Sequence, residues 1–158
     1  KEFFYFTSIR NPRDRYLSNY YRNKRDFEKN GNKFMSLEDF LKERIDQGLD
    51  NYYVRFFSSK KIYSDSSVKV NQEHLYDSFE NLKKLNFIFF LDDMKKNLID
   101  FKKNFSWLFD MTYFFNLHKN KVSNSAYPKI SPKENDLLNE LTTYDSKLYD
   151  EIKNFKLR

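Results

Sequence analysis

The hydrophobic residues of this 158-residue chain form two continuous apolar runs, separated by long stretches in which apolar positions recur at helical spacing. Residues 2–9 and 86–91 are rich in aromatic and β-branched side chains and contain neither Gly nor Pro, so each is predicted to be a buried strand. Runs of this kind are typical of parallel strands that are covered on both faces. We therefore expect an α/β fold in which the two strands lie parallel in one sheet.

The stretches between and after these runs are predicted to be mostly helical. Apolar spacing indicates helices over residues 13–29, 37–48, 74–85 and 94–105. Residues 51–57 fit either a short helix or a strand, and we place a helix there. The run Ser131-Pro132-Lys133-Glu134 predicts a further helix start, because it combines an N-cap Ser, a first-turn Pro and a Glu three residues after the cap. Residues 58–67 and the polar, basic stretch 117–129 are predicted to be loops.

Length and composition narrow the classes of protein. The length predicts one domain, residues 1–158. Its 18 Phe, 12 Tyr and 1 Trp argue against intrinsic disorder, because aromatic side chains bury large areas. No run approaches the roughly 18 consecutive apolar residues of a membrane span. The chain has no Cys, which excludes disulfides and thiolate metal sites, and we expect no metal cofactor.

The basic residues are unevenly placed. Lys and Arg total 29 against 23 Asp and Glu, and the net charge of +6 favours anionic partners such as phosphate, sulfate, nucleic acid or acidic glycans. Five of the eight Arg fall in one short stretch of a chain that otherwise prefers Lys: Arg10, Arg13, Arg15, Arg22 and Arg25. Arg offers a planar fork that binds two phosphate oxygens at once, so this stretch is where we expect anion recognition.

The stretch contains the pattern R-N-P-x-x-R-x-x-S-x-Y over residues 10–20. Arg10 leaves the carboxyl end of a predicted parallel strand, which is the edge where open α/β sheets hold ligands. The next helix would present Arg15 and Ser18 three residues apart on one face. We therefore predict that these three side chains bind a phosphate monoester. We interpret Arg13, Arg22 and Arg25 as surface charges on other faces of that helix.

This pattern resembles the 3′-phosphate-binding motif of the sulfotransferases that use 3′-phosphoadenosine 5′-phosphosulfate, especially the Golgi-type carbohydrate sulfotransferases and their bacterial relatives. The match is at six positions. Residues 51–55 resemble the N-x-x-x-R segment of that family, and residues 87–91 with the following helix resemble its late strand and helix. The chain end resembles the family's closing pattern over residues 120–123, 131–134 and 145–149. The resemblance covers most of the chain in the family's order.

The resemblance implies a P-loop-NTPase-like parallel sheet with flanking helices and a helix-rich C-terminal half. It also implies binding of the nucleotide 3′-phosphoadenosine 5′-phosphosulfate by Arg10, Arg15 and Ser18, together with a late loop that includes Lys119, Asn120, Lys121 and Ser123. Asn51 and Arg55 are implied as contacts to the acceptor substrate, a hydroxyl compound that we expect to be a carbohydrate. A helix cap and an ion pair are the alternative roles for these two residues.

One feature of the family is missing from this sequence. The family's first strand leads into a P-loop-like turn that grips the 5′-phosphosulfate, whereas this chain has only two Gly, Gly31 and Gly48, and no such segment. We therefore expect the P-loop strand and helix, and the catalytic base, to lie upstream of Lys1, and the chain alone to be an inactive fragment. The resemblance implies the cytoplasm for a bacterial protein and the Golgi lumen for a eukaryotic one.

Two other functions stay open. A nucleic-acid-binding module would use the positive charge and the aromatic residues for phosphate attraction and base stacking. We expect no nucleic-acid partner, because many aromatic residues fall within apolar strands and helix faces. A nucleotide kinase would have a similar fold and a phosphorylated substrate, but the sequence lacks the G-x-x-x-x-G-K-[ST] pattern that such enzymes need.

Overall fold

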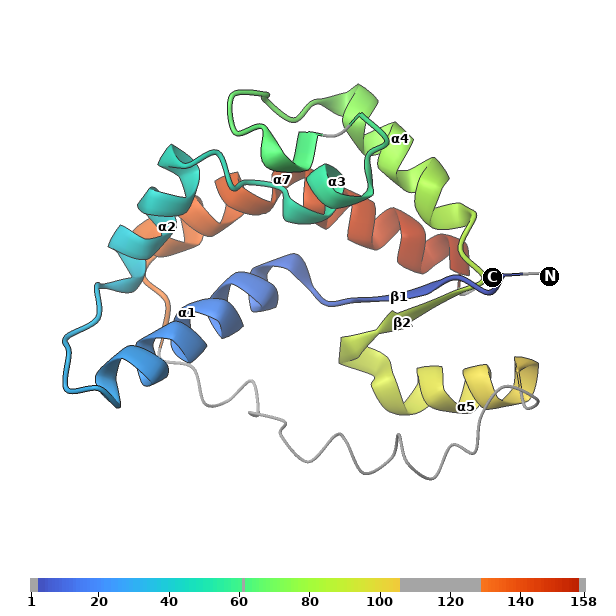
Figure 1. The fold of residues 1–158 in the computed structure, drawn as a ribbon, viewed down its shortest axis with the longest axis horizontal. Helices are drawn as coiled ribbons and strands as arrows, with labels where there is room; N and C mark the ends of the chain where they lie inside the picture. The colour runs from blue at the N-terminus through green and yellow to red at the C-terminus, as the bar shows by residue number, and fades with distance from the viewer. Residues whose placement is uncertain (1–2, 61, 106–128, 157–158) are drawn as a thin grey trace.

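The two apolar runs form the strands of a small parallel sheet in a helix-rich α/β fold (Figure 1). The structure is a computed structural model and describes residues 3–60, 62–105 and 129–156. The elements in these ranges are β1 (Phe6–Ile9), α1 (Pro12–Glu28), α2 (Leu37–Asp46), α3 (Tyr52–Phe57), η1 (Ile62–Ser64), α4 (Gln72–Lys83), β2 (Phe87–Phe90), η2 (Leu91–Asp93), α5 (Met94–Asn104) and α7 (Pro132–Lys156). The predicted helices, including the short one after residue 51, are confirmed.

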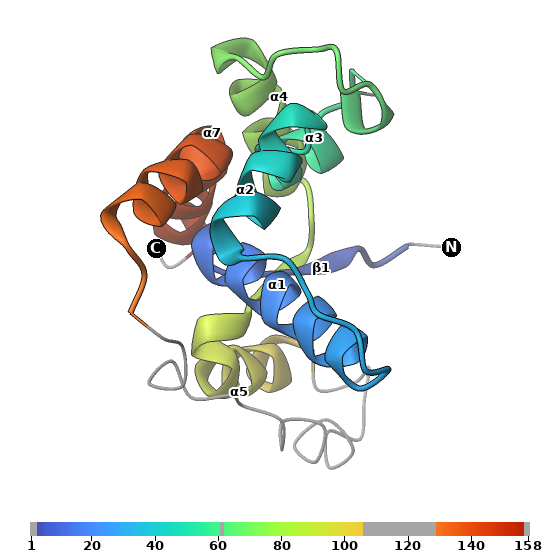
Figure 2. The same ribbon diagram turned by 90° about the vertical axis from the view of Figure 1, so that its left-hand side faces the viewer.

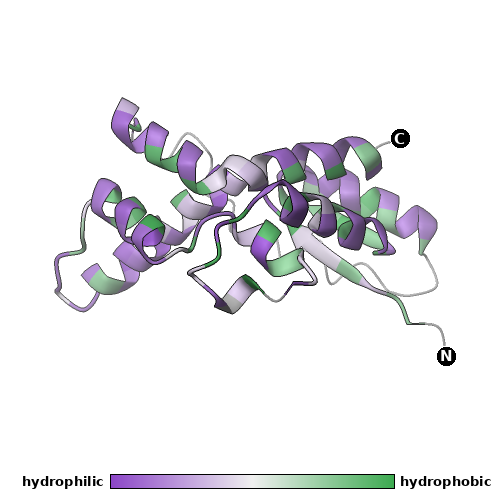
Figure 3. Cartoon of the chain, turned by 90° about the horizontal axis from the view of Figure 1, so that it is seen from above, coloured by the Kyte–Doolittle hydropathy of each residue, from purple (hydrophilic) through white to green (hydrophobic). Residues whose placement is uncertain are grey.

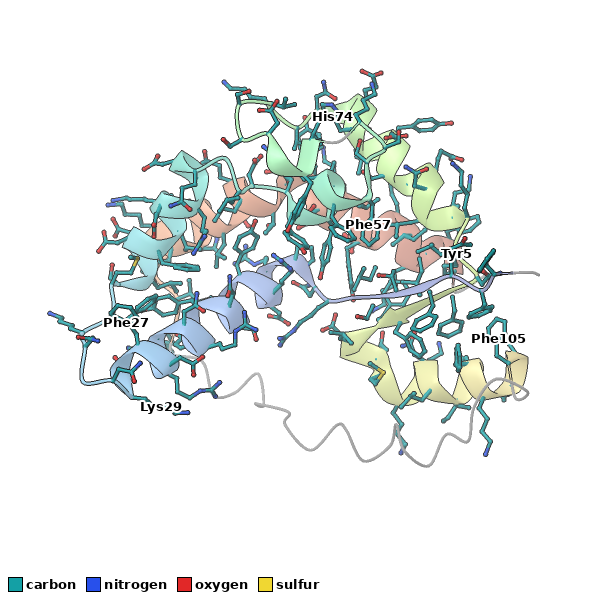
Figure 4. The ribbon with its side chains drawn as sticks, in the orientation of Figure 1. Tyr5, Phe27, Lys29, Phe57, His74 and Phe105 are labelled. Atoms are coloured by element: carbon teal, nitrogen blue, oxygen red, sulfur yellow. The ribbon has the colours of Figure 1, made fainter. Side chains whose placement is uncertain are left out.

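Strands β1 and β2 pair in parallel, with Phe6 opposite Phe87 and Ile9 opposite Phe90. This confirms the predicted strand direction. On one face of β2, Ile88 and Phe90 join the main core cluster with residues of α4 and α7. On the other face, aromatic side chains fill the space between the sheet and α5, near Phe105 (Figure 4). A strand covered on both faces needs apolar residues at every position, which accounts for the continuous run in β2.

Strand β1 differs from the prediction of a buried strand over residues 2–9. Its ladder covers only Phe6–Ile9, and Phe3, Tyr5 and Phe6 are 73%, 59% and 54% exposed. Both strands are edge strands of this two-stranded sheet, so edge position does not account for the difference. Among the described elements, β2 packs against α5 as well as against β1, whereas β1 packs extensively against β2 and extensively against no helix. An apolar run predicts that a strand forms, but burial also requires a covering element, and local sequence does not show whether one is present.

Helix α7 is the central helix of the described fold. It packs against α1, α2, α3 and α4. Figure 1 shows α7 behind α2 and α3, and Figure 2, turned by 90°, shows it beside them. Leu138 and Leu141 belong to the core cluster shared with α1 and α2. Leu148 and Ile152 belong to the cluster shared with the strands and α4. One long amphipathic helix therefore joins both parts of the core, and Figure 3 shows the interspersed hydrophobic and hydrophilic residues along the helices.

The helix starts follow from local capping chemistry. The Ser36 hydroxyl accepts a hydrogen bond from the Asp39 amide at 3.1 Å, which caps α2. At the start of α7, the Ser131 amide donates to a Glu134 carboxylate oxygen at 2.7 Å, and the Glu134 amide donates to the Ser131 hydroxyl at 3.3 Å. This reciprocal pair is a capping box and confirms the helix start predicted from residues 131–134.

The position of α7 yields a stability prediction. Leu148→Ala is expected to lower the free energy of unfolding by about 2–5 kcal/mol, because it leaves a cavity at a side chain that is 1% exposed. Urea unfolding followed by circular dichroism measures this change. Glu151→Ala, at an exposed position of the same helix, is the control and should change stability by no more than about 0.5 kcal/mol. Equal effects of the two substitutions would show that α7 is not a core helix.

Candidate functional site

The candidate site begins where β1 ends, at Arg10 and Asn11. The Arg10 amide donates a hydrogen bond to the Tyr53 hydroxyl of α3 at 2.9 Å. The Asn11 amide donates to a carboxylate oxygen of Asp92, which follows β2, at 3.0 Å. Two consecutive backbone groups are thus held by elements on different sides of the turn. The backbone from which the Arg10 side chain extends is therefore fixed by the fold.

Helix α1 starts directly after this turn. The Asn11 side-chain oxygen accepts hydrogen bonds from the amides of Arg13 at 3.1 Å and Asp14 at 3.4 Å, and Pro12 occupies the first turn. These are the contacts of an N-cap residue. Because the cap already uses those two amides, a phosphate at this position would be bound by side chains rather than by the helix N-terminus.

The Arg10 guanidinium makes no hydrogen bond or ion pair with any residue in the described ranges. Asp14 is a charged neighbour, and its pKa is raised above the ordinary value by burial and by Asp92, while Arg10 and Arg13 lower it. The Arg10 guanidinium is therefore close enough to one carboxyl group to interact with it electrostatically, and its donors stay available. The sequence predicted an Arg at the carboxyl end of this strand, and the structure places Arg10 directly after β1.

Arg15 and Ser18 lie on the face of α1 away from the buried side chains Tyr16 and Leu17. The Arg15 guanidinium stacks on the Tyr52 ring, with 3.3 Å between its central carbon and the ring centroid. Stacking uses the flat face of the guanidinium and leaves the N–H groups at its edge available. The Ser18 hydroxyl has no hydrogen-bond partner in the part of the chain that the structure describes. Both groups are thus available to a ligand.

The remaining arginines of α1 differ from the interpretation made from sequence. Arg13 donates to the side chains of Asn135 and Asn139, so it joins α1 to α7. Arg22 lies four residues after Ser18, and helical periodicity places it on the same face rather than on another one. Arg25 lies seven residues after Ser18, so it also falls on this face, but two turns further along the helix. Among the described residues, its ion pair is with the adjacent Asp26 at 3.8 Å. Its distance from Ser18 makes Arg25 a better charge control than Arg22.

Arg55 has a structural role, which corrects its predicted role as an acceptor contact. Its side chain is 4% exposed. The guanidinium donates to the carboxylate and carbonyl of Asp50 and to the carbonyls of Ile62, Asp65 and Val68 at 2.6–3.3 Å. All three nitrogens are thus engaged, and the side chain closes the turn around η1. The alternative interpretation as an ion pair is correct for Asp50, with Arg55 buried and the Asp50 side chain partly exposed.

Asn51 also has a structural role instead of the predicted acceptor contact. It is 2% exposed and adopts a left-handed φ of 46°, a conformation that Asn tolerates better than most residues. Its amide donates to the Leu141 carbonyl at 2.7 Å, and its side-chain oxygen accepts from the amides of Tyr144 at 2.7 Å and Asp145 at 3.2 Å. The side chain is therefore held against the backbone of α7, where no substrate can contact it.

Asp145 completes this contact from the other side and is a residue that the sequence analysis missed. Its carboxylate is 0% exposed and accepts hydrogen bonds from the amides of Tyr53 at 3.0 Å and Val54 at 2.9 Å. Asp145 therefore caps α3 from another helix. Burial raises the pKa of this carboxyl to about 7, although the two amide bonds act in the opposite direction. The signal in the sequence was an acidic residue on the apolar face of α7.

Tyr149, one turn after Asp145, supports the other side of the site. Its hydroxyl donates to the Asp92 carboxylate at 2.6 Å, and the same oxygen accepts from the Asn11 amide. Burial and the hydrogen bond to Asp92 raise the Tyr149 pKa, so the hydroxyl keeps its proton for donation. Asp145 holds α3, whose Tyr53 binds the Arg10 amide. Tyr149 holds Asp92, which binds the Asn11 amide. One face of α7 thus positions the turn that carries Arg10.

The predicted nucleotide-loop residues Lys121 and Ser123, with Lys119 and Asn120, lie outside the described residues. Within residues 3–60, 62–105 and 129–156, no three His, Cys, Asp or Glu side chains are grouped as metal ligands would be. None of the helices in these same ranges is both long and apolar enough to span a lipid bilayer.

Comparison with protein-family models, with curated proteins and with solved structures found no match to this chain. The feature to explain is a fixed turn that carries Arg10 directly before a helix with Arg15 and Ser18 on its outer face.

The structural role of Arg55 is tested by Arg55→Lys. The Lys ammonium keeps the charge but cannot reach the separate acceptors that the guanidinium joins, so the free energy of unfolding is expected to fall by about 1–3 kcal/mol. Urea unfolding measures the change. Arg25→Lys, at an exposed position of α1, is the control and should have little effect. An Arg55→Lys protein as stable as the wild type would contradict the structural role.

The burial of Asp145 predicts a pH dependence of stability. Because its pKa is raised from 3.8 to about 7 on folding, the folded state holds the proton more tightly than the unfolded chain. The resulting stabilisation is present below pH 3.8 and is lost as the pH rises through about 7. Relative to Asp145→Asn, which cannot titrate, the wild-type free energy of unfolding should fall by about 1.4 kcal/mol per pH unit within this window. A difference that stays constant with pH would refute this prediction.

Proposed function

We propose that this chain is part of a sulfotransferase that uses 3′-phosphoadenosine 5′-phosphosulfate, and that Arg10, Arg15 and Ser18 bind the nucleotide 3′-phosphate. The observation that carries the proposal is the Arg10 guanidinium at the carboxyl end of a parallel strand. Its backbone is fixed by Tyr53 and its donors have no partner among the described residues. The second guanidinium and the hydroxyl on the adjacent helix face support it.

A phosphate monoester is the ligand that suits these groups. It carries close to two negative charges at neutral pH and three acceptor oxygens. Arg10 would bind two oxygens through its fork, Arg15 would donate from the edge that stacking leaves free, and Ser18 would supply one hydroxyl. Asp14 would lie near the bound phosphate and oppose it electrostatically. The contact of Arg10 with the phosphate must therefore be stronger than its electrostatic attraction to the Asp14 carboxyl group.

In the proposed reaction, the acceptor hydroxyl oxygen forms a bond to sulfur while the bond between sulfur and the 5′-phosphate oxygen breaks. The acceptor proton passes to a base, and the products are a sulfate ester and adenosine 3′,5′-diphosphate. The role of Arg10, Arg15 and Ser18 is to orient the nucleotide, since the 3′-phosphate takes no part in bond making. Lys121 and Ser123 are proposed to close over the nucleotide, and a carbohydrate hydroxyl is the proposed acceptor. The parallel pairing of β1 and β2 between helices supports a P-loop-like sheet.

The proposal predicts that Arg10→Ala weakens binding of adenosine 3′,5′-diphosphate by roughly ten- to a hundredfold, the value of one charge-assisted contact. Binding of adenosine 5′-phosphate, which lacks the 3′-group, should change far less. Ser18→Ala should lose less than Arg10→Ala, and Arg10→Lys should restore binding only in part because the fork is absent. Isothermal titration calorimetry of each variant with both nucleotides gives these ratios.

Arg25→Ala is the matched control, because it removes the same charge from α1 at an exposed position two turns beyond Ser18. It should leave nucleotide affinity nearly unchanged. Equal losses in Arg10→Ala and Arg25→Ala would mean that only diffuse positive charge attracts the nucleotide, and would overturn the proposal. Tighter binding of ATP would favour a nucleotide kinase, and tighter binding of a single-stranded oligonucleotide would favour a nucleic-acid-binding module.

A further inference from the structure

Helix α5 carries a lysine face, which we define as Lys95, Lys96, Lys102 and Lys103. All four side chains are exposed, as is Ile99 between them. Helical periodicity places these five residues within one third of the helix circumference, opposite the side that packs on the sheet. Side chains tipped with nitrogen extend from α5 away from the strands (Figure 4). The helix therefore presents two pairs of ammonium groups, seven residues or about 10 Å apart along its axis.

The lysine face has no acidic partners in the described ranges. None of its ammonium groups lies within 4.0 Å of a carboxylate oxygen there. The acidic residues at the start of α5 are engaged elsewhere, since Asp92 accepts hydrogen bonds from Asn11 and Tyr149, and Asp93 pairs with Lys153 at 2.7 Å. Asp100 lies four residues after Lys96 and three before Lys103, so its carboxylate offsets part of this charge. The lysine face keeps an excess of positive charge, which an anionic partner would neutralise.

We propose that the lysine face binds a linear anionic saccharide, a chain bearing carboxylate or sulfate groups. The proposal that this saccharide is the acceptor rests on the sulfotransferase function proposed above. The binding surface itself rests only on charge complementarity. Lysine ammonium groups are flexible point charges, which suits repeated anionic groups along a flexible chain better than a single phosphate bound in fixed geometry.

Two other polyanions fit this surface less well. Single-stranded nucleic acid binds to basic grooves that also offer aromatic side chains for base stacking, and the exposed face of α5 has none. An anionic membrane would be bound by an amphipathic helix that inserts a broad apolar face. On α5, the apolar face packs instead against the sheet, and Ile99 at 45% exposed is the large apolar side chain on the outer face.

The position of α5 connects the lysine face to the candidate nucleotide site. The first turn of α5 lies beside a shallow hollow of about 380 Å³, lined by Asp92, Asp93, Met94, Lys95, Lys96 and Ile99. Asp92 also holds the Asn11 amide, next to Arg10. A saccharide lying along α5 would thus reach the carboxyl end of the two strands with one end. The pair Lys102 and Lys103 would hold the chain further away, which favours long acceptors over monosaccharides.

The test compares binding of heparin to the wild type and to a variant with all four lysines of the lysine face changed to Gln. The variant should bind heparin roughly tenfold or more weakly, with a smaller dependence of affinity on salt, because four exposed charge contacts are lost. The control changes four exposed lysines on other elements and loops, Lys29, Lys33, Lys69 and Lys147, to Gln. It removes the same total charge and should retain most of the affinity. Unchanged thermal unfolding shows that both variants fold.

Several outcomes would overturn the proposal: no binding of heparin by the wild type, an equal loss in the control variant, or tighter lysine-dependent binding of a single-stranded oligonucleotide or of phosphatidylserine vesicles. Measuring adenosine 3′,5′-diphosphate binding as well distinguishes the saccharide-binding proposal from the sulfotransferase proposal. The lysine-face variant should bind adenosine 3′,5′-diphosphate like the wild type, and Arg10→Ala should bind heparin like the wild type. Heparin binding without nucleotide binding would support the saccharide surface and overturn the sulfotransferase function.

Discussion

The rest of the structure depends on a reciprocal contact between Asn51 and Asp145. Asn51 accepts hydrogen bonds from two amides of α7, and Asp145 of α7 accepts two from the start of α3. Each side chain satisfies backbone groups of the other segment, and both are buried where an unmade hydrogen bond would be costly. This constraint fixes α3 on α7 in one position, and the left-handed backbone of Asn51 is tolerated because of it.

The contact between Asn51 and Asp145 also positions the candidate site, because it holds α3 in place. With α3 in place, Tyr53 holds the Arg10 backbone and Tyr52 supports the Arg15 guanidinium. Tyr149, one turn beyond Asp145, reaches the same turn through Asp92. A binding site needs side chains whose positions are set by packing and by hydrogen bonds behind them. Here that support comes from a polar network that is buried at Asn51 and Asp145 and exposed at Asp92, and that joins α7, α3 and the ends of both strands.

The arginines of the candidate nucleotide site and the lysines of α5 have different surroundings, and this difference distinguishes the two proposed binding surfaces. Arg10 and Arg15 are partly buried, the Arg10 backbone is fixed by Tyr53, and the Arg15 guanidinium stacks on Tyr52, which suits one phosphate in fixed geometry. The lysine face of α5 is exposed and carries an excess of positive charge, which suits a longer anionic chain. The other buried guanidinium, Arg55, binds only groups of its own chain. The residue type alone therefore does not show whether an Arg binds a ligand or stabilises the fold. The answer depends on how deeply the Arg is buried and on whether the chain itself provides hydrogen-bond acceptors around it.

The sequence by itself determined the elements whose causes are local. The apolar run of β2, the Pro12 start of α1 and the capping box at Ser131 each act within a few residues, so the strand, the helix starts and the motif after β1 were predictable. Tertiary structure alone decided that β1 has an exposed face, that Asn51 and Arg55 are buried, and that Asp145 caps α3. Asn51 and Asp145 are 94 residues apart in the chain, and no local pattern encodes a partner so distant. The physical reason is that a side chain's role depends on which groups surround it after folding.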